Sequence, residues 1–404
     1  MSAARHGSDT HRPGDPANTP DSSRLRALAE ADQPLHALAT RLLGLAETGL
    51  PAMLLPTGDG FVFTRVGTAA EDGSWTLEQR GTSLRYAAIT ALGVRLLPLD
   101  RQRAVLGGHT AEEFTGLLIQ QLLSVVNLGD AALVAWAAAE TGHPKLSDAL
   151  DRVAALDESG RPQYTVEAAW VLSALAAARS TVDVEERLAA ARDRLMGARI
   201  DGSPLFPHAT GPGLNPWYRS HVGCFADQTY PLQALARAHA SGDDPEALAA
   251  ADACAARICA LQGDGGQWWW HYDAPRGEVV EGYPVYSVHQ HAMAPTALLD
   301  LADAGGTDFG AAIRLGLRWM TDVPELGPGG EPLVLDELGV TWRKVYRGDP
   351  KKAVRAARGL TTRVAPGLRL RPLDRVFRPA SVDRECRPYE FGWMLYAWLG
   401  GLRG

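Results

Sequence analysis

Residues 230–261 read YPLQALARAHASGDDPEALAAADACAARICAL, and this stretch decides the fold. Apolar residues recur at three- and four-residue spacing on both sides of the turn at residues 241–245, which predicts two helices joined by a tight loop. The same order of helix, short Gly/Asp turn and helix recurs in residues 133–156 and 287–320. Because a helical hairpin cannot bury its own apolar stripe, several hairpins must pack side by side.

About a dozen helices are expected along the chain. Their predicted starts are Arg24, Arg85, Glu112, Asp130, Lys145, Thr165, Val184, Asp227, Glu246, Ser287, Asp308 and Tyr389. This number of helices allows the hairpins to close into an α/α toroid, an all-α fold, with an open solenoid as the alternative. Long loops near residues 201–220 and 263–284 favour a ring with a built-up rim. A short β-hairpin is predicted near residues 61–79.

The composition is that of an ordinary globular chain. It has 404 residues, 46% of them hydrophobic, and 40 Lys and Arg against 47 Asp and Glu, which gives a formal charge of −7. A chain of this length buries a large core without disulfides, so a mini-protein scaffold is excluded. The four cysteines contain no CxxC pair, and Cys254 and Cys259 have no histidine at ligand spacing. With no phosphate-binding glycine motif after a strand, we expect neither a metal nor a cofactor.

The ends of the chain and its charge suggest four regions. These are a disordered tail (1–23), the toroid (24–332), a basic segment of loop and helix (333–380) and a final toroid helix (381–404). The first 24 residues are polar, and no apolar stretch reaches the roughly 18 residues of a membrane span, so a cytoplasmic protein is expected.

Positive charge is concentrated in residues 343–378. This segment contains twelve Lys and Arg against two Asp, a charge of +10, which leaves 28 − 45 = −17 for the rest. Such a run is a solvated face, or it binds an anionic partner or a membrane surface. Aromatic residues are sparse within it, so nucleic-acid binding is not expected.

Residues 262–273, QGDGGQWWWHYD, carry the first resemblance to a known family. Gln262, Gly266 and Trp268 match the Q-x-x-x-G-x-W repeat, or QW motif, of squalene and related terpene cyclases, which are α/α toroids. The motif occurs here once, and neither the Asp-x-Asp-Asp proton donor nor the Asp-Asp-x-x-Asp metal motif of terpene enzymes is present. The resemblance therefore supports the fold more than the reaction. Gln262 and Trp268 are interpreted as a helix cap and a plug between hairpins.

Residues 227–301 carry a second resemblance. Their order of helix, turn, helix, Trp-rich loop and Glu281–His291 segment is similar to that of α/α-barrel carbohydrate enzymes: glucuronyl C5-epimerases, N-acylglucosamine 2-epimerases and unsaturated glucuronyl hydrolases. The resemblance is one of layout, and it transfers no catalytic residue.

Residues 281–291 form the best candidate site, because they open a helix whose start faces one rim of the central cavity. Tyr283, Tyr286, His289 and His291 lie in this segment. His289 and His291 are two residues apart and cannot share a helical face, so one is expected to point inward and the other to be structural. Tyr283 and His289 are the predicted acid/base groups, with His291 as a further catalytic candidate.

Further candidates come from three other segments. Arg219 and His221 are predicted anion binders; Asp227 is a substrate-binding candidate or the cap of its helix. Trp269 and Trp270 are predicted to form a stacking platform, and His271 and Tyr286 are further substrate-binding candidates. Glu390 opens the final helix among aromatic residues, where burial would raise its pKa and make it a second acid; the alternative is a dipole partner in the first helical turn.

Three hypotheses for function follow. The first is a cofactor-independent enzyme acting as epimerase, lyase or hydrolase on an anionic, uronate-type small molecule or oligosaccharide. The second is a terpenoid cyclase or lyase, in which aromatic faces stabilise a cation. The third is a helical-repeat scaffold that binds a protein. Converging Arg, His, Glu and Tyr side chains favour the sugar enzyme, an aromatic and aliphatic lining with one acid favours the cyclase, and a plugged ring favours the scaffold.

Overall fold

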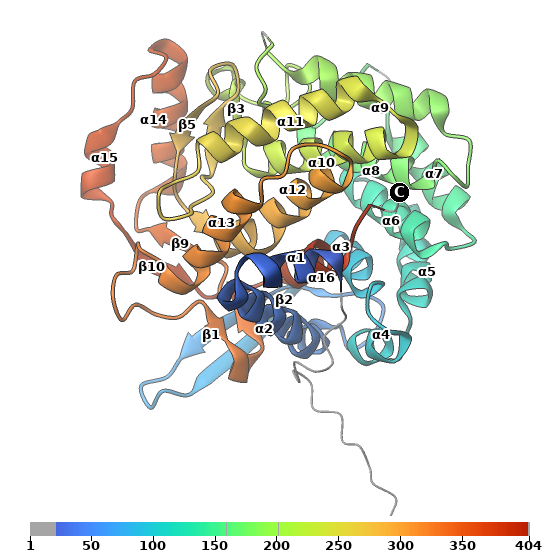
Figure 1. Cartoon of the computed structure of the whole chain (residues 1–404), viewed down its shortest axis with the longest axis horizontal. Helices are drawn as coiled ribbons and strands as arrows, with labels where there is room; N and C mark the ends of the chain where they lie inside the picture. The colour runs from blue at the N-terminus through green and yellow to red at the C-terminus, as the bar shows by residue number, and fades with distance from the viewer. Residues whose placement is uncertain (1–21, 159, 201, 403–404) are drawn as a thin grey trace, which may run out of the picture.

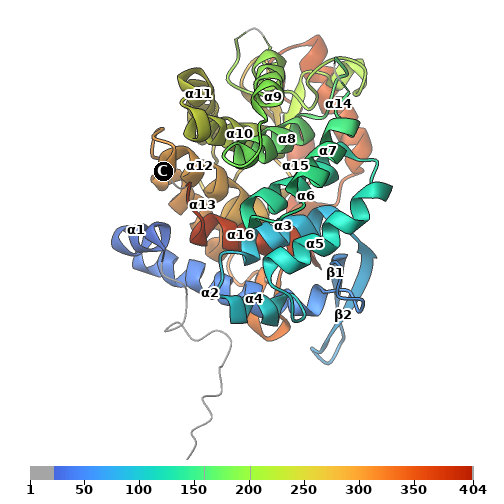
Figure 2. The same ribbon diagram turned by 90° about the vertical axis from the view of Figure 1, so that its right-hand side faces the viewer.

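A computed structural model describes residues 22–158, 160–200 and 202–402 of the chain. Six inner helices form a closed ring, each packing against the next and the last against the first (Figures 1 and 2). In ring order they are α3 (Leu84–Val94), α6 (Leu128–Thr141), α8 (Thr165–Ala178), α10 (Ala226–Gly242), α12 (Ala294–Asp303) and α16 (Pro388–Leu399). The all-α toroid predicted from the hairpins is confirmed.

Six outer helices cover this ring. They are α2 (Gln33–Gly49), α5 (Ala111–Gln121), α7 (Leu146–Leu156), α9 (Glu185–Ala198), α11 (Pro245–Ala260) and α13 (Gly310–Asp322). The two layers differ in pattern because their surroundings differ. Residues 131–138 of α6 are all buried, as expected for a helix covered on every side, whereas α7 buries only one face through Leu146, Ala149, Leu150 and Val153.

Glycines close the ring where its last helix meets its first. A Cβ on Gly93 of α3 would lie 2.1 Å from the carbonyl oxygen of Gly392 in α16, and a Cβ on Gly392 would lie 2.6 Å from the carbonyl oxygen of Ile89. Only glycine permits so close an approach of two helix backbones.

Four further helices and five single turns complete the helical part of the described residues. The helices are α1 (Ser23–Ala31), α4 (Leu99–Val105), α14 (Lys351–Val364) and α15 (Arg371–Val376). The turns are η2 (Pro51–Met53), η3 (Leu122–Ser124), η4 (Trp217–Arg219), η5 (His289–Met293, a π-helix) and η6 (Asp336–Leu338). The helical pattern of residues 25–45 breaks into α1 and α2 because Asp32, in an extended conformation, ends the first and caps the second. Of the predicted tail, residues 1–21 lie outside the described residues, while Ser22 caps α1.

Four small antiparallel sheets lie outside the helix layers. Their strands are β1 (Val62–Ala69), β2 (Trp75–Thr82), β3 (Val222–Cys224), β4 (His271–Asp273), β5 (Glu278–Glu281), β6 (Val285–Tyr286), β7 (Val334–Leu335), β8 (Val340–Thr341), β9 (Lys344–Arg347), β10 (Pro379–Asp383) and β11 (Glu385–Cys386). The strand orders are β11-β1-β2, β10-β9-β6, β3-β4-β5 and β7-β8. The hairpin β1-β2 is the one predicted near residues 61–79, and it projects from the helices in Figure 2.

The basic segment folds onto one rim of the ring. Strand β9 pairs with β6 and β10, and α14 packs against β5 and η4. Figure 1 shows α14 and α15 beside β5 and β3, at the edge of the helix layers. This rim is built from segments that are far apart in the sequence.

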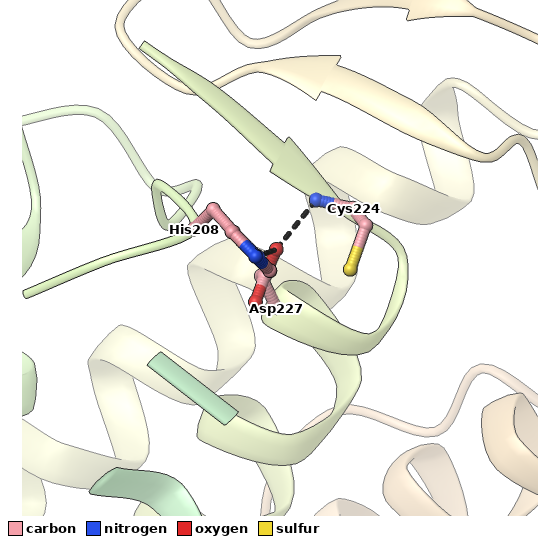
Figure 3. Close-up of side chains that lie close together, drawn as sticks. All are labelled: His208, Cys224 and Asp227. Carbon is pink, nitrogen blue, oxygen red and sulfur yellow. Dashed lines mark hydrogen bonds and ion pairs between the residues drawn. The ribbon is translucent and has the colours of Figure 1, made fainter. Parts of the chain in front are cut away.

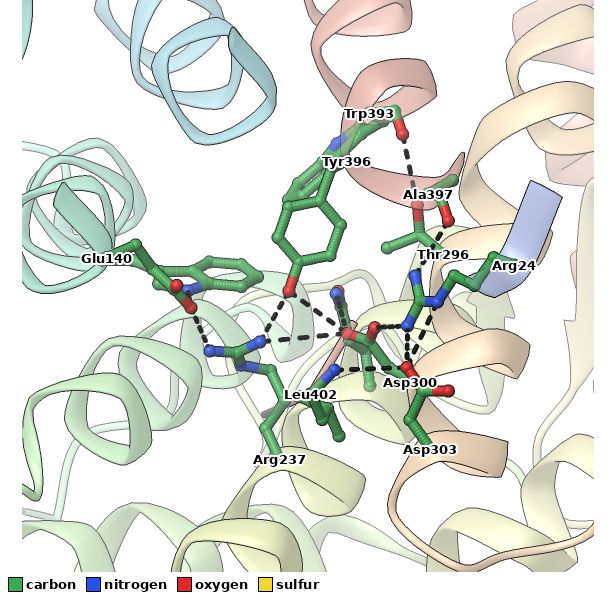
Figure 4. A network of polar contacts seen from close by, with 12 residues as sticks. Arg24, Glu140, Arg237, Thr296, Asp300, Asp303, Trp393, Tyr396, Ala397 and Leu402 are labelled. Carbon is green, nitrogen blue, oxygen red and sulfur yellow. Dashed lines mark hydrogen bonds and ion pairs between the residues drawn. The ribbon is translucent and has the colours of Figure 1, made fainter. Parts of the chain in front are cut away.

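A buried polar network ties together the C-terminal ends of the inner helices (Figure 4). Asp300 of α12, fully buried, contacts Arg24 at 2.6 Å and Gln233 at 2.8 Å, and Arg237 donates to the Tyr396 hydroxyl at 2.5 Å. Arg237 also pairs with Glu140, which is held by Arg95 at 2.6 Å. Three arginines (Arg24, Arg95 and Arg237) thus meet three carboxylates (Glu140, Asp300 and Asp303), and this end of the ring is electrically balanced.

Candidate active site

A cavity of about 250 Å³ opens at the other end of the ring, where the inner helices begin. It is lined by Arg85, Tyr86, Ile89, Val166, Trp170, Cys224, Phe225, Ala226, Tyr230, Trp270, Tyr286, His289, Met293, Arg343 and Tyr389. Most of these residues lie in the first two turns of α3, α8, α10 and α16, or in η5, which precedes α12. The helix starts direct unpaired backbone N–H groups and the positive ends of their dipoles toward this rim, which favours an anionic ligand.

Arg85 provides one cation of the cavity wall. Its Nε lies 2.7 Å from Asp130 Oδ1, and its guanidinium donates to the Asn127 side chain at 2.8 Å. The amide of Asn127 in turn donates to Glu167 at 2.8 Å. These contacts hold the Arg85 guanidinium 5.0 Å from the centroid of the Trp170 ring, with about a third of its side chain still exposed.

Arg343 provides the second cation, and it comes from the basic segment. Its guanidinium lies 5.0 Å from the centroid of the Tyr286 ring. The nearest carboxylate oxygens, on Glu385 and Asp383, are 3.6 and 3.9 Å away, too far for short ion pairs. Its charge is therefore only partly neutralised by the protein.

Aromatic rings also line the cavity. The His289 ring lies 4.4 Å from Phe225 and 4.8 Å from Tyr286, centroid to centroid, and Trp270 lies 6.2 Å from Tyr286. Burial lowers the pKa of His289 to about 3, so its imidazole is neutral at physiological pH. His289 therefore offers a hydrogen-bonding group and a weak base, and not a cation.

The backbone irregularity at η5 explains how His289 and His291 separate. Residues 289–293 form a π-helical turn, a feature common at functional sites. Pro295 has no N–H, so it leaves the carbonyl of His291 free, and the indole of Trp398 donates to that oxygen at 3.1 Å. His289 lines the cavity, whereas His291 is 1% exposed and is not among the lining residues. Burial also lowers the pKa of His291 to about 3.

Glu390 is buried at the start of α16, next to the cavity-lining Tyr389. Neither carboxyl oxygen has a hydrogen-bond partner among the described residues. Burial raises the pKa of Glu390 to about 8, although the charges of Arg343 and Arg387 lower it. This carboxyl group therefore carries its proton near neutral pH, which is the state required of a general acid.

Tyr283 lies outside the main cavity. Its hydroxyl donates to Glu325 at 3.1 Å, and burial raises its pKa. It lines a second, narrow pocket together with Trp270, Glu281, Pro284, Tyr346, Arg347, Asp349, Val354 and Arg355. Trp270 lines both spaces and forms the wall between them.

The remaining predicted site residues surround the cavity without lining it. His221 is buried, its Nε2 lies 2.9 Å from the Thr362 hydroxyl, and its pKa is lowered by burial to about 4. His271 is buried with its ring 4.0 Å from that of Trp270. Trp269 packs near Gly263 and Gly282, where a Cβ would lie 2.5 and 2.9 Å from the indole. Arg219 ends η4 beside α14.

Asp227 is fully buried and joins two neighbours (Figure 3). Its Oδ2 accepts the backbone N–H of Cys224 at 2.6 Å and lies 2.8 Å from His208 Nδ1. The three side chains place their ligand atoms within 4.8 Å of one another, the only group among the described residues with metal-like spacing. Since these groups already hydrogen-bond to one another, the arrangement does not require a metal ion. Asp227 raises the pKa of His208 and orients its ring.

The QW residues hold the outer layer together. Gln262 donates to the carbonyl oxygens of Gly266 at 3.1 Å and of Ala312 in α13 at 3.0 Å. Trp268 is completely buried, 5.6 Å from Phe225 between ring centroids. These contacts are those of the cap and plug interpretation, and neither residue lines the cavity.

The lining also includes residues that were not chosen as site candidates: Trp170, Tyr230, Arg343 and Tyr389, together with Arg85 and Tyr86. One signal would have found half of them. Arg85, Tyr86 and Tyr389 lie in the first turn of an inner helix, and all such turns meet at one rim. Arg343 gave no such signal, because it reaches the cavity from a strand-like loop of the basic segment.

No family model matches the chain, and no curated protein matches it in sequence. Solved structures do resemble it. A possible GH105 family member from Klebsiella pneumoniae superposes with a TM-score of 0.54 over 98% of both chains at 11% identity. An unsaturated glucuronyl hydrolase specific for heparin gives 0.53 over 91% of this chain and 96% of its own at 14% identity. Cellobiose 2-epimerase from Bacillus thermoamylovorans gives 0.53 over 90% and 98% at 11% identity.

At this low identity the likenesses establish the α/α-toroid fold, which they share from end to end. Within the described ranges, no helix is both long and apolar enough to cross a bilayer.

Proposed function

We propose that the chain is an enzyme that acts on an anionic, uronate-containing carbohydrate in the cavity at the helix starts. The observation that carries the proposal is the convergence there of Arg343, whose charge is only partly neutralised, and Arg85, which pairs with Asp130, with aromatic walls. The protonated Glu390 is buried beside the lining residue Tyr389. A sugar acid needs cations for its carboxylate and flat apolar surfaces for its ring. The three solved structures named above are described as carbohydrate-acting proteins or as a possible member of such a family, which supports a carbohydrate as the substrate.

The proposed roles follow from position. Arg343 and Arg85 bind the carboxylate, and Trp270 with Tyr286 forms the platform for the sugar ring. Glu390 is the proposed proton donor because it is neutral near pH 7. His289, neutral and in the lining, is the proposed proton acceptor. Tyr283 lies in the narrow pocket, so a role in substrate positioning fits its place better than proton transfer.

The same observations argue against the two competing functions, a protein-binding scaffold and a terpenoid cyclase. An open cavity of about 250 Å³ argues against a scaffold whose centre is plugged. Two arginines and a histidine in the lining argue against a terpenoid cyclase, whose cavity would be aromatic and aliphatic. The aromatic walls alone are compatible with either enzyme.

The test is incubation of the purified chain with uronate-containing oligosaccharides in D₂O, followed by mass spectrometry and ultraviolet absorbance. Deuterium uptake into an intact sugar indicates epimerisation, an unsaturated product indicates a lyase, and cleavage without unsaturation indicates a hydrolase. Glu390→Gln is expected to lower the rate at least a hundredfold, as removal of a general acid does. The exposed Glu337→Gln is the matched control. Turnover of squalene or prenyl diphosphates, with none of the uronates changed, contradicts the proposal.

A further inference from the structure

The arginines of the basic segment differ in whether the protein neutralises them. Arg347 and Arg358 are buried and share two carboxylates. Arg347 lies 2.7 Å from Asp374 and 3.6 Å from Glu281, and Arg358 lies 2.5 Å from Glu281 and 2.7 Å from Asp374. Two positive and two negative charges balance, so this cluster holds α14 and α15 against β5 and needs no ligand.

Arg355, one turn before Arg358 on α14, is different. Its guanidinium lies 3.9 Å from the centroid of the Trp270 ring. No carboxylate of the described residues is within ion-pair distance, and its solvent-shielded Nε has no hydrogen-bond partner among them. Asp349 and Glu281 act on it only through longer-range charge, and burial lowers its pKa. Arg355 is thus a cation held in place by an aromatic ring and left without a counter-ion.

A second cation lies beside it. Arg219 of η4 packs its aliphatic stem on α14 at Gly359, where a Cβ would lie 2.9 Å from Arg219 Cγ. The charge of Arg219 lowers the pKa of both Arg355 and His271, so the two guanidinium groups act on the same small region. No described carboxylate pairs with Arg219. Two partly buried like charges without an anion are unfavourable, which indicates that an anion belongs between them.

Arg355 also lines the narrow pocket, whereas Arg219 does not. Trp270 separates this pocket from the main cavity, so the two spaces adjoin through one residue. The pocket itself has a free volume of only about 10 Å³, room for about one water molecule, and Glu281 and Asp349 also line it. An anion between Arg355 and Arg219 therefore has to lie outside this pocket, against the two guanidinium groups. We propose that Arg355 and Arg219 bind a second anionic group, a sulfate or carboxylate on the sugar next to the one held in the cavity. This inference rests on the proposed function and narrows it to an oligosaccharide that carries at least two anionic groups.

The test compares two disaccharides by calorimetric titration of the full chain. Both consist of an unsaturated glucuronate linked to N-acetylgalactosamine, and one has a 6-sulfate. The unchanged protein is expected to bind the sulfated sugar about tenfold or more tightly, as a charge-assisted contact implies. Arg355→Gln is expected to reduce that ratio to about twofold or less. Lys352→Gln removes an exposed charge from the same helix and is expected to keep the ratio. Equal affinity of the unchanged protein for both sugars overturns the second subsite and leaves the proposed function standing.

A second measurement decides the case in which neither sugar binds, which would count against the proposed function. Thermal unfolding is followed with sodium sulfate against sodium chloride at matched ionic strength. Sulfate stabilises proteins generally, so the informative quantity is the difference between variants. The unchanged protein is expected to gain more from sulfate than Arg355→Gln does, and an equal gain overturns the anion site.

The stability of the anion-free protein provides a control on structure. Arg355→Gln is expected to be as stable as the unchanged chain, because it relieves a like-charge contact, while Arg358→Gln breaks a balanced cluster and is expected to unfold more easily. An equal loss of stability in both variants would show that Arg355 is structural and would overturn the proposal.

Discussion

The two ends of the inner ring use the same residue types in opposite ways. At the C-terminal end, every charge of the Arg237 and Asp300 network has a partner, and three arginines meet three carboxylates (Figure 4). At the N-terminal end, Arg343 and Arg355 lack close carboxylates, and Glu390 has no hydrogen-bond partner among the described residues. Burying a charged or polar group without a partner costs stability. A fold therefore retains such a group where the group meets a ligand or holds a proton.

The presence or absence of charge partners therefore distinguishes residues that stabilise the fold from residues that serve function, without use of any related protein. A balanced network contributes to one packed arrangement of the helices, and its loss is felt as unfolding. An unbalanced group is prepared for a ligand or for a proton, and its loss is felt in binding or in pH dependence. The following changes test whether the two ends behave in these two ways.

The largest effect on stability is expected at the balanced end. Asp300→Asn keeps the shape of the side chain but leaves Arg24 and Arg237 with one carboxylate fewer in a fully buried site. Removing one partner of a buried pair costs about 3 kcal/mol or more, to be measured by urea unfolding. Asp303→Asn is the matched control on the same helix: its side chain is 29% exposed, and about 1 kcal/mol is expected. If both variants lose the same free energy of unfolding, then burial does not determine how much these ion pairs contribute to stability.

The next effect depends on pH and concerns Glu390. Its pKa rises from 4.5 in the unfolded chain to about 8 in the folded one. Between these values the folded protein holds a proton that the unfolded chain releases, so stability is highest below pH 4.5 and falls as the pH rises to 8. The slope of this contribution is about 1.4 kcal/mol per pH unit at most.

Glu390→Gln removes this contribution, because glutamine does not titrate. The variant is expected to match the unchanged protein at pH 5 and to exceed its unfolding free energy by a few kcal/mol at pH 8, measured by urea unfolding at both values. The same variant is expected to lose the proposed activity, so that a single substitution raises stability at pH 8 and removes function. If the variant is less stable than the unchanged protein at pH 8, then Glu390 is a structural residue, like the paired charges at the C-terminal end of the ring.

The helical layers could be predicted from the sequence because their signals are local. Alanine-rich periodicity and turn residues mark each hairpin, and Thr110 with Glu113 forms a capping box at the start of α5. Such signals need only neighbouring residues. They also located His289 and Tyr286, since both lie just before the inner helix α12, and inner-helix starts share one rim.

The rest of the site depends on contacts between distant segments, which no local pattern encodes. Strand β3 pairs with β4 about fifty residues later, and Arg358 meets Glu281 across a longer interval. The sequence revealed the charge of residues 343–378 but not which arginines are neutralised. Arg343 and Arg355 were therefore indistinguishable from Arg347 and Arg358 until the fold placed the carboxylates.

The smallest effect on stability, and the sharpest test of the comparison, is expected for Arg343→Gln. Its carboxylate neighbours lie at 3.6 and 3.9 Å, so little ion-pair energy is lost, and a decrease below about 1 kcal/mol is expected in urea unfolding. Affinity for a uronate sugar should fall about tenfold or more, while affinity for the corresponding neutral sugar stays within about twofold, both measured by calorimetry. The control is Arg41→Gln, which removes an exposed ion pair with Asp336 and should change neither affinity. If Arg343→Gln instead loses as much stability as Asp300→Asn, then cations at both ends of the ring are structural, and incomplete pairing does not identify the site.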